Sequence, residues 1–144
     1  KLAVGQNLEM ELGGKDHVTL DDYLKLIYYK TASLIESSMI VGAYSVGVKD
    51  GDVIRKIRDV GRFVGLAFQI RDDLIDYLNI DVKNPTLDDE INIVKILNRN
   101  NGDINVSINT ARKLLNEMLD NAIDVIKTTI NSDILVNYIN LLRI

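Results

Sequence analysis

The sequence predicts an all-α helical bundle. Apolar residues recur at the three- and four-residue spacing of a helix face along most of the chain, and the alternation typical of a β-strand never lasts more than a few residues. Proline occurs once in 144 residues, so little interrupts long helices. The longest predicted helix, Val53 to Leu78, is apolar on most sides, which indicates that other helices surround it.

The first long helix is predicted to begin at Thr19. Thr19 and Asp22 have the spacing of a capping box with Asp in place of Glu. Apolar residues recur at helical spacing from Leu20 to Gly42. Small residues from Thr31 to Ser38 allow a close neighbouring helix or a bend near the middle of this segment.

The central helix is predicted to follow a turn and N-cap at Asp50 to Asp52. Gly61 and Gly65 lie four residues apart inside it. Because a glycine inside a helix costs about 1 kcal/mol relative to alanine, we expect a neighbouring helix to approach closely at both positions.

A loop from 79 to 85 should separate the central helix from a shorter one. Thr86 or Asp88 is the expected N-cap, and Asp89 and Glu90 in the first turn favour the helix dipole. The polar run 98–102 ends this helix.

Two further helices are expected, one from Ser107 or Asn109 and a final one from Ser132 or Asp133. Their inward positions are predicted to be Ala111, Leu114, Leu115, Met118, Ala122, Ile126 and Ile130 in the first, and Leu135, Val136, Ile139 and Leu142 in the second. The length suits one domain or half of a larger one.

Composition argues against several classes of function. The absence of cysteine excludes disulfides, thiolate nucleophiles and cysteine-based zinc sites. A net charge of -4 without a basic tract argues against nucleic acid as a partner. No apolar run approaches the roughly 18–20 residues that cross a bilayer. No signal-like start is visible, although the sequence begins at Lys1 rather than Met, and we expect a cytoplasmic protein.

The segment 68–76 is the most informative part of the chain. In a helix that turns about 100° per residue, its polar side chains share one side. We call this set the acidic face: Gln69, Asp72, Asp73 and Asp76. Like charges at this spacing repel by about 0.2–0.5 kcal/mol per pair, and the apolar neighbours add a desolvation cost. A divalent cation would offset both, and Mg²⁺ is the metal expected.

A cation and a hydroxyl, Lys30 and Thr31, lie upstream in a segment that is otherwise apolar or small. Together with the acidic face they describe a pocket for a diphosphate. Each residue alone has a plainer interpretation. Lys30 could extend along an apolar surface, Thr31 could bond back to its own turn, and Gln69 could simply bond a neighbouring helix.

The order and spacing of these motifs resemble the trans-isoprenyl diphosphate synthases (polyprenyl synthetases). The matching strings are Gly5-Gln6, Lys30-Thr31-Ala32 and Gly65-x-x-Phe68-Gln69-x-x-Asp72-Asp73-x-x-Asp76. The last string is similar to that family's second aspartate-rich motif, at 72–76. The resemblance extends to about Pro85, and the later helices match in character. Residues 1–144 therefore resemble the C-terminal half of the isoprenoid synthase fold.

The resemblance implies roles for the acidic face. Asp72 would ligate Mg²⁺ directly, and Asp73 and Asp76 would be further ligands or would support them. Lys30, Asp72 and Asp73 are the residues expected to be catalytic.

The resemblance also implies a substrate site. Lys30 would bind the diphosphate of the allylic substrate, helped by Thr31 and Gln69. Lys83 is the best match for a further lysine that the family carries after the second motif, although the loop is shorter here. Where many relatives have Asp after Gly-Gln, this chain has Glu9.

One expected feature is absent from the 144 residues. The family carries a first aspartate-rich motif and an arginine pair in its N-terminal half, and nothing here supplies either. The acidic pairs Asp21-Asp22 and Asp88-Asp89 lie at predicted helix starts and are interpreted as caps. The chain is therefore either a fragment or one subunit of a split, heteromeric enzyme, and we favour the split. The partner would carry the first motif, and a half-domain with an apolar face should associate further.

The implied reaction is a Mg²⁺-dependent condensation of an allylic prenyl diphosphate with isopentenyl diphosphate, of polyprenyl or geranylgeranyl type. It needs no protein nucleophile, which agrees with the absence of cysteine. Two alternatives remain: a non-catalytic regulatory or scaffolding subunit of a prenyl diphosphate synthase, and one half of a terpene cyclase. Retention of the acidic face argues against the first, and the strings Phe68-Gln69 and Lys30-Thr31 argue against the second.

Overall fold

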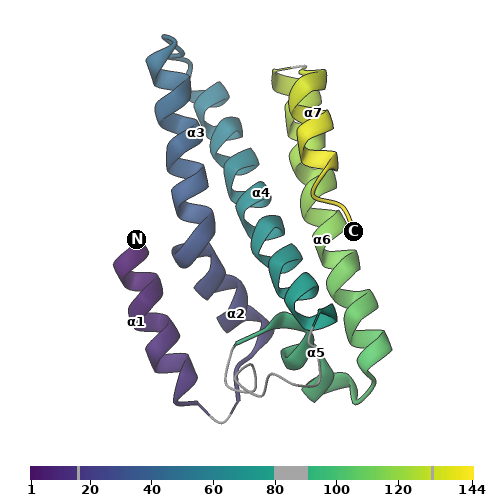
Figure 1. Ribbon diagram of the computed structural model, residues 1–144. Coiled ribbons are helices and arrows are strands. Elements are labelled where there is room, and N and C mark those ends of the chain that lie inside the picture. Colours follow the sequence, from purple (N-terminus) through teal and green to yellow (C-terminus); the bar gives the residue numbers. More distant parts are fainter. Residues whose placement is uncertain (16, 80–90, 131) are drawn as a thin grey trace.

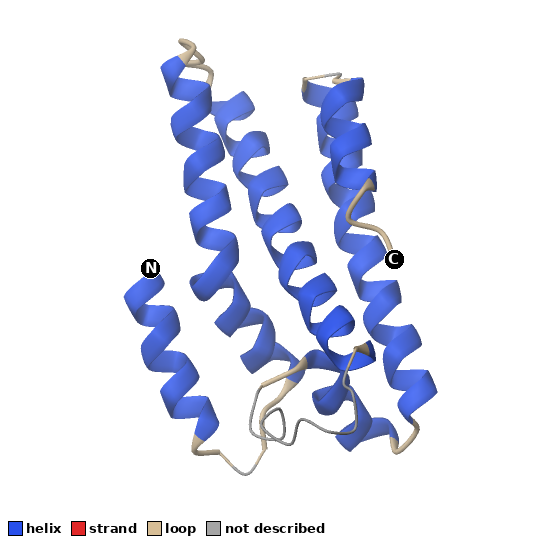
Figure 2. Cartoon of the chain, viewed as in Figure 1, coloured by secondary structure: helices blue, strands red, loops and turns tan. Residues whose placement is uncertain are grey.

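The computed structural model describes residues 1–15, 17–79, 91–130 and 132–144, and these residues form helices joined by loops, with no strand among them (Figure 2). The predicted all-α class is confirmed. The helices are α1 (Leu2–Gly13), α2 (Leu20–Ile27), the π-helical turn η1 (Tyr28–Ala32), α3 (Ser33–Ser45), α4 (Gly51–Leu78), α5 (Ile93–Asn101), α6 (Ile104–Thr129) and α7 (Asp133–Asn140).

Helix α4 lies at the centre of the molecule, as its apolar surface predicts. It packs against α3 on one side and α6 on the other, and the three helices run side by side (Figure 1). Helix α1 packs against η1, α7 folds back along α6, and α2 and α5 meet at the end of α4 that carries the acidic face. None of the described helices has the length and apolarity that a bilayer-crossing segment needs.

Two predicted caps begin the helices around the acidic face. The Thr19 hydroxyl accepts from the Asp22 backbone N–H at 3.1 Å, and the Asp22 carboxylate accepts from the Thr19 N–H at 3.3 Å, which confirms the capping box. The Asp50 carboxylate accepts from the Asp52 and Val53 N–H groups and caps α4. Each cap contributes about 1 kcal/mol to helix stability.

The two glycines inside α4 lie close to neighbouring elements, as predicted: Gly65 faces η1 and Gly61 faces α3. A Cβ on Gly65 would lie 2.4 Å from the Ala32 Cα, and a Cβ on Gly61 would lie 2.7 Å from the Glu36 Cα. No side chain fits at either position, so these elements can approach at this distance only because both residues are glycine.

The predicted start of α6 is wrong by three to five residues. The helix begins at Ile104, and its N-cap is Asp103, whose carboxylate accepts from two backbone N–H groups. Ser107, one of the two expected starts, is 0% exposed and its hydroxyl bonds back to the Asp103 carbonyl. The other expected start, Asn109, lies within the second turn of the helix.

The second half of the fold contains two further corrections. Helix α5 begins at Ile93 with Asn92 as its cap, and the expected caps Thr86 and Asp88 lie outside the described residues. Ile130, expected to point inward, is 40% exposed, while Leu119 is fully buried.

Candidate functional site

The predicted cation and hydroxyl lie in the π-helical turn η1. The Ser33 N–H donates to the Tyr28 carbonyl five residues earlier, so this turn holds one more residue than an α-helical turn. The sequence predicts a possible bend here, and the structure shows that it is a π turn. Helix α1 presses on its outer side: a Cβ on Gly5 would lie 2.8 Å from the backbone nitrogen of Lys30. Turns of this kind often occur at functional sites because they redirect side chains.

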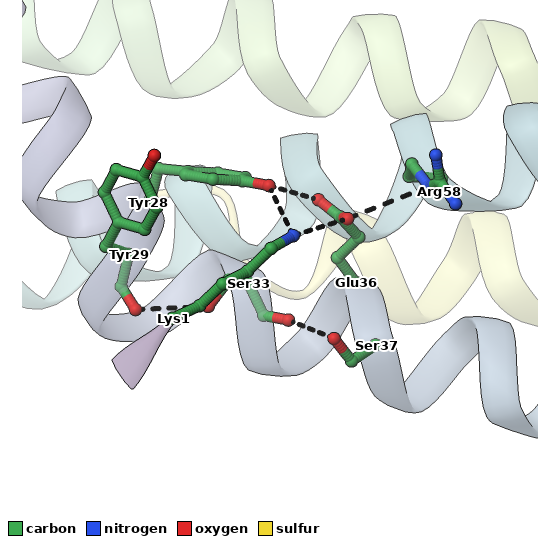
Figure 3. A network of polar contacts seen from close by, with 7 residues as sticks. All are labelled: Lys1, Tyr28, Tyr29, Ser33, Glu36, Ser37 and Arg58. Carbon is green, nitrogen blue, oxygen red and sulfur yellow. Dashed lines mark hydrogen bonds and ion pairs between the residues drawn. The ribbon is translucent and has the colours of Figure 1, made fainter. Parts of the chain in front are cut away.

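A polar network spans the π turn (Figure 3). The Tyr28 hydroxyl donates to Glu36 at 3.0 Å, Lys1 donates to the same carboxylate at 3.4 Å, and Arg58 lies 3.8 Å from it. Glu36 is 5% exposed. Residues eight apart in a regular helix are offset by about 80°, and the extra residue of the π turn brings Tyr28 and Glu36 into line. The network therefore links the start of η1 to Glu36 of α3 and, through Glu36, to Arg58 of α4.

Lys30 lies at the surface beside this turn. Its ammonium forms an ion pair with Glu9 of α1 at 2.5 Å, and the two side chains are 47% and 41% exposed. The Lys30 ammonium is thus accessible to a ligand and is already paired with the Glu9 carboxylate.

Thr31 and Gln69 meet between η1 and α4, as expected of a shared site. The Thr31 hydroxyl donates to the Gln69 side-chain oxygen at 2.9 Å. Thr31 therefore bonds across the helix pair, not back to its own turn. The plainer interpretation of Gln69 also holds, because this bond is itself a bond to a neighbouring helix.

Asp73 lies inside the protein and is surrounded by donors. It is 7% exposed. One carboxylate oxygen accepts from the Tyr23 hydroxyl at 2.8 Å and the Ile93 backbone N–H at 3.0 Å, and the other accepts from the Gln69 amide at 3.1 Å. Burial raises the pKa of Asp73, while these three hydrogen bonds lower it. Burial also raises the pKa of Tyr23, and the charge of Asp73 adds to that effect.

Asp72 and Asp76 remain on the open side of α4. Asp76 is exposed and Asp72 is partly buried. Burial raises the pKa of Asp72, the charge of Asp76 raises it further, and Arg71 opposes both.

The donor set on the described part of the chain suits a cation shared with another ligand. No group of three or more His, Asp or Glu side chains among the described residues is arranged to hold a metal by itself. Asp72 and Asp76 offer two free carboxylates, and Mg²⁺ typically takes one or two, completing its shell with water and phosphate oxygens. The metal-ligand roles of Asp72, Asp73 and Asp76 stay predictions. For Asp73, the three donors favour a supporting role over direct ligation.

Lys83, which is predicted to bind the diphosphate, lies outside the described residues. The sequence did not predict two groups that donate hydrogen bonds to the site. Tyr23 and the Ile93 N–H, which hold Asp73, have no motif of their own. The signal that could have found Tyr23 is general: a tyrosine on an apolar helix face needs a partner for its hydroxyl.

The sequence is similar to known isoprenoid enzymes. The family model of polyprenyl synthetase matches residues 1–89. The chain is 39% identical over 79 residues to a short chain isoprenyl diphosphate synthase of Methanothermobacter thermautotrophicus, covering 55% of this chain and 24% of that protein. It is 38% identical over 74 residues to a geranylgeranyl diphosphate synthase of Sulfolobus acidocaldarius, covering 51% and 22% respectively.

Solved structures show the same fold over nearly the whole chain. A geranylgeranyl pyrophosphate synthetase from Geoglobus acetivorans superposes with a TM-score of 0.85 at 24% identity, covering 98% of this chain and 52% of that one. A heptaprenyl diphosphate synthase from Staphylococcus aureus superposes with a TM-score of 0.84 at 23% identity, covering 98% of this chain and 55% of that one. The chain thus spans about half the length of these structures. Because the family model covers more than half of its residues, the chain belongs to the polyprenyl synthetase family.

Proposed function

We propose that this chain is one part of a Mg²⁺-dependent prenyltransferase that condenses an allylic prenyl diphosphate with isopentenyl diphosphate. The observation that carries the proposal is the contact between Thr31 and Gln69 at 2.9 Å. It brings the turn with Lys30 against the helix that carries Asp72 and Asp76. A cation, neutral donors and two free carboxylates on adjoining helices suit a metal-bound diphosphate.

Each side chain would have a distinct task. Asp72 and Asp76 would hold Mg²⁺, which when bound supplies positive charge to the departing diphosphate. Lys30 would pair with a diphosphate oxygen in place of Glu9, and Gln69 would donate an amide N–H. No residue here needs to form a covalent bond to substrate, so the contribution of the chain is positioning and electrostatics.

We further propose that residues 1–144 form the C-terminal half of the synthase domain and that a partner polypeptide supplies the rest. The chain spans about half the length of the solved structures it matches. No first aspartate-rich motif occurs among its 144 residues. A diphosphate leaving group carries about three negative charges, and two carboxylates hold only one side of the cations needed to neutralise it. The partner would provide the opposing aspartates and the isopentenyl diphosphate site.

The test is a prenyl-transfer assay with radiolabelled isopentenyl diphosphate, an allylic diphosphate and Mg²⁺. We expect no product from the purified chain and prenyl product when its co-purifying partner is added. Product from the chain alone would contradict the split arrangement. If the complex makes no product, the chain is instead a regulatory or scaffolding subunit, and conversion of a single prenyl diphosphate without isopentenyl diphosphate would identify a cyclase.

A further inference from the structure

Hydrogen bonds link the π turn to α2 through the acidic face. The Thr31 hydroxyl donates to the Gln69 oxygen at 2.9 Å, and the Gln69 amide nitrogen donates to Asp73 at 3.1 Å. From the opposite side, the Tyr23 hydroxyl and the Ile93 N–H donate to the other oxygen of Asp73, at 2.8 and 3.0 Å. Three donors therefore converge on the Asp73 carboxylate, and Thr31 is linked to it through Gln69.

This convergence fixes the orientation of the Gln69 amide. An ionised carboxylate only accepts hydrogen bonds, so Gln69 must turn its nitrogen toward Asp73. Its oxygen then faces Thr31, whose hydroxyl proton is used in that bond. Among the described residues, the second amide N–H of Gln69 has no acceptor, and this is the donor that a ligand oxygen can take.

We propose that Tyr23 is a positioning residue of the diphosphate site. Tyr23 is 0% exposed, so it touches no substrate. Together with Ile93, it occupies one oxygen of Asp73 and stops the carboxylate from rotating, so that the other oxygen stays on Gln69. The ligand named here, a diphosphate, rests on the proposed function; the control of the Gln69 amide by Tyr23 does not.

The isosteric variant Tyr23→Phe removes one hydroxyl and keeps the buried ring. A matched control is Tyr138→Phe, because Tyr138 is 73% exposed on α7. The chain has two glutamines, Gln69 and the exposed Gln6. An NMR spectrum of the chain labelled with side-chain ¹⁵N-glutamine therefore shows two amide groups, and Gln6 serves as an internal reference.

In the wild-type chain we expect the Gln69 amide protons to exchange with solvent more slowly than those of Gln6. In Tyr23→Phe we expect the Gln69 signals to move and to lose this protection. Affinity of the complex with its partner for inorganic pyrophosphate with Mg²⁺, measured by calorimetry, should fall about two- to tenfold, which corresponds to one hydrogen bond. Tyr138→Phe should change neither measurement.

A second variant, Asp73→Asn, tests the same claim with charge removed. If Tyr23 and Ile93 keep the Asn oxygen, its NH₂ group faces Gln69 and the Gln69 amide must turn over. The Gln69 signals should then shift further than in Tyr23→Phe, and pyrophosphate affinity should fall more.

Two results would overturn the inference: Gln69 protons that exchange as fast as those of Gln6 in the wild type, or a Tyr23→Phe variant that only lowers the melting temperature while the Gln69 signals and the affinity stay unchanged. A complex of the wild-type chain with its partner that binds no pyrophosphate with Mg²⁺ would contradict the proposed function instead. In that case the Gln69 signals still decide the role of Tyr23.

Discussion

Asp72 and Asp73 are adjacent in sequence and differ in burial and in hydrogen bonding. Asp73 is 7% exposed and accepts three hydrogen bonds, while Asp72 lies on the open side of α4 with Asp76 as a neighbour of like charge. Helical spacing predicts that both share a face, and it cannot show how deep each one lies. That depth depends on Tyr23 and Ile93, which come from other elements 50 and 20 residues away.

Replacement by alanine should separate the two aspartates. Asp72→Ala should lower turnover of the assembled enzyme by orders of magnitude, while the melting temperature holds or rises because repulsion from Asp76 is relieved. Asp73→Ala should instead unfold more easily, since each buried donor left unpaired costs roughly 1–3 kcal/mol. Circular dichroism melts and the prenyl-transfer assay measure both effects. A large loss of stability in Asp72→Ala with activity retained would show that Asp72 is structural.

The pKa of Asp72 predicts a pH dependence of stability. Burial and Asp76 raise this pKa above its ordinary value of 3.8, so ionisation opposes folding. The stabilising contribution is present below the unfolded pKa and is lost as pH rises through the folded pKa. Asp72→Asn, which cannot ionise, should therefore melt at a higher temperature than wild type at neutral pH. The difference should vanish below pH 3.8; a difference that is constant with pH contradicts the assignment.

At the scale of elements, the predictable features are those that local chemistry specifies. The capping box at Thr19 and the cap at Asp50 begin their helices as expected, because the capping groups lie within three residues of their partners. The π turn η1 has no such local signature. It forms where α1 and α4 press on the chain from two sides, at Gly5 and Gly65, so only tertiary contacts specify it.

The contact at Gly65 gives a prediction for this element. Gly65→Ala should destabilise the protein by about 1–3 kcal/mol, because the new methyl group would meet the Ala32 backbone and the gain in helix propensity is only about 1 kcal/mol. Gly42→Ala in α3 is the matched control. Apart from its own helix backbone and chain neighbours, no heavy atom of the described residues lies within 4 Å of its Cβ position, so propensity alone should stabilise it. Denaturant melts measure both, and equal effects would mean that α3 and α4 can separate without cost.

At the scale of the molecule, apolar side chains remain on the surface of this half-length chain. On α7 and just beyond it, Ile134, Tyr138 and Leu141 are 76%, 73% and 72% exposed, and on α3 Val41 is 66% exposed. The overall fold class followed from helical periodicity. Periodicity could not predict which faces stay uncovered, because it marks a face as apolar without showing what packs on it.

These exposed apolar faces predict association. The purified chain should sediment as species of several copies, heavier than the 16.2 kDa of one copy, and these should give way to a complex with the partner once it covers the faces. Sedimentation velocity over a range of concentrations measures it. A chain that stays at one-copy mass throughout would remove the need for a covering partner.

If a diphosphate binds as proposed, the ion pair between Lys30 and Glu9 makes its capture an exchange of one anion for another. The backbone of Lys30 is packed against Gly5, so the Glu9 side chain, and not α1, would have to move when the diphosphate pairs with the Lys30 ammonium. The displaced Glu9 carboxylate would stay near the bound anion, and their mutual repulsion would weaken its retention. A helix remote from the metal ligands would in this way hasten departure of the spent pyrophosphate.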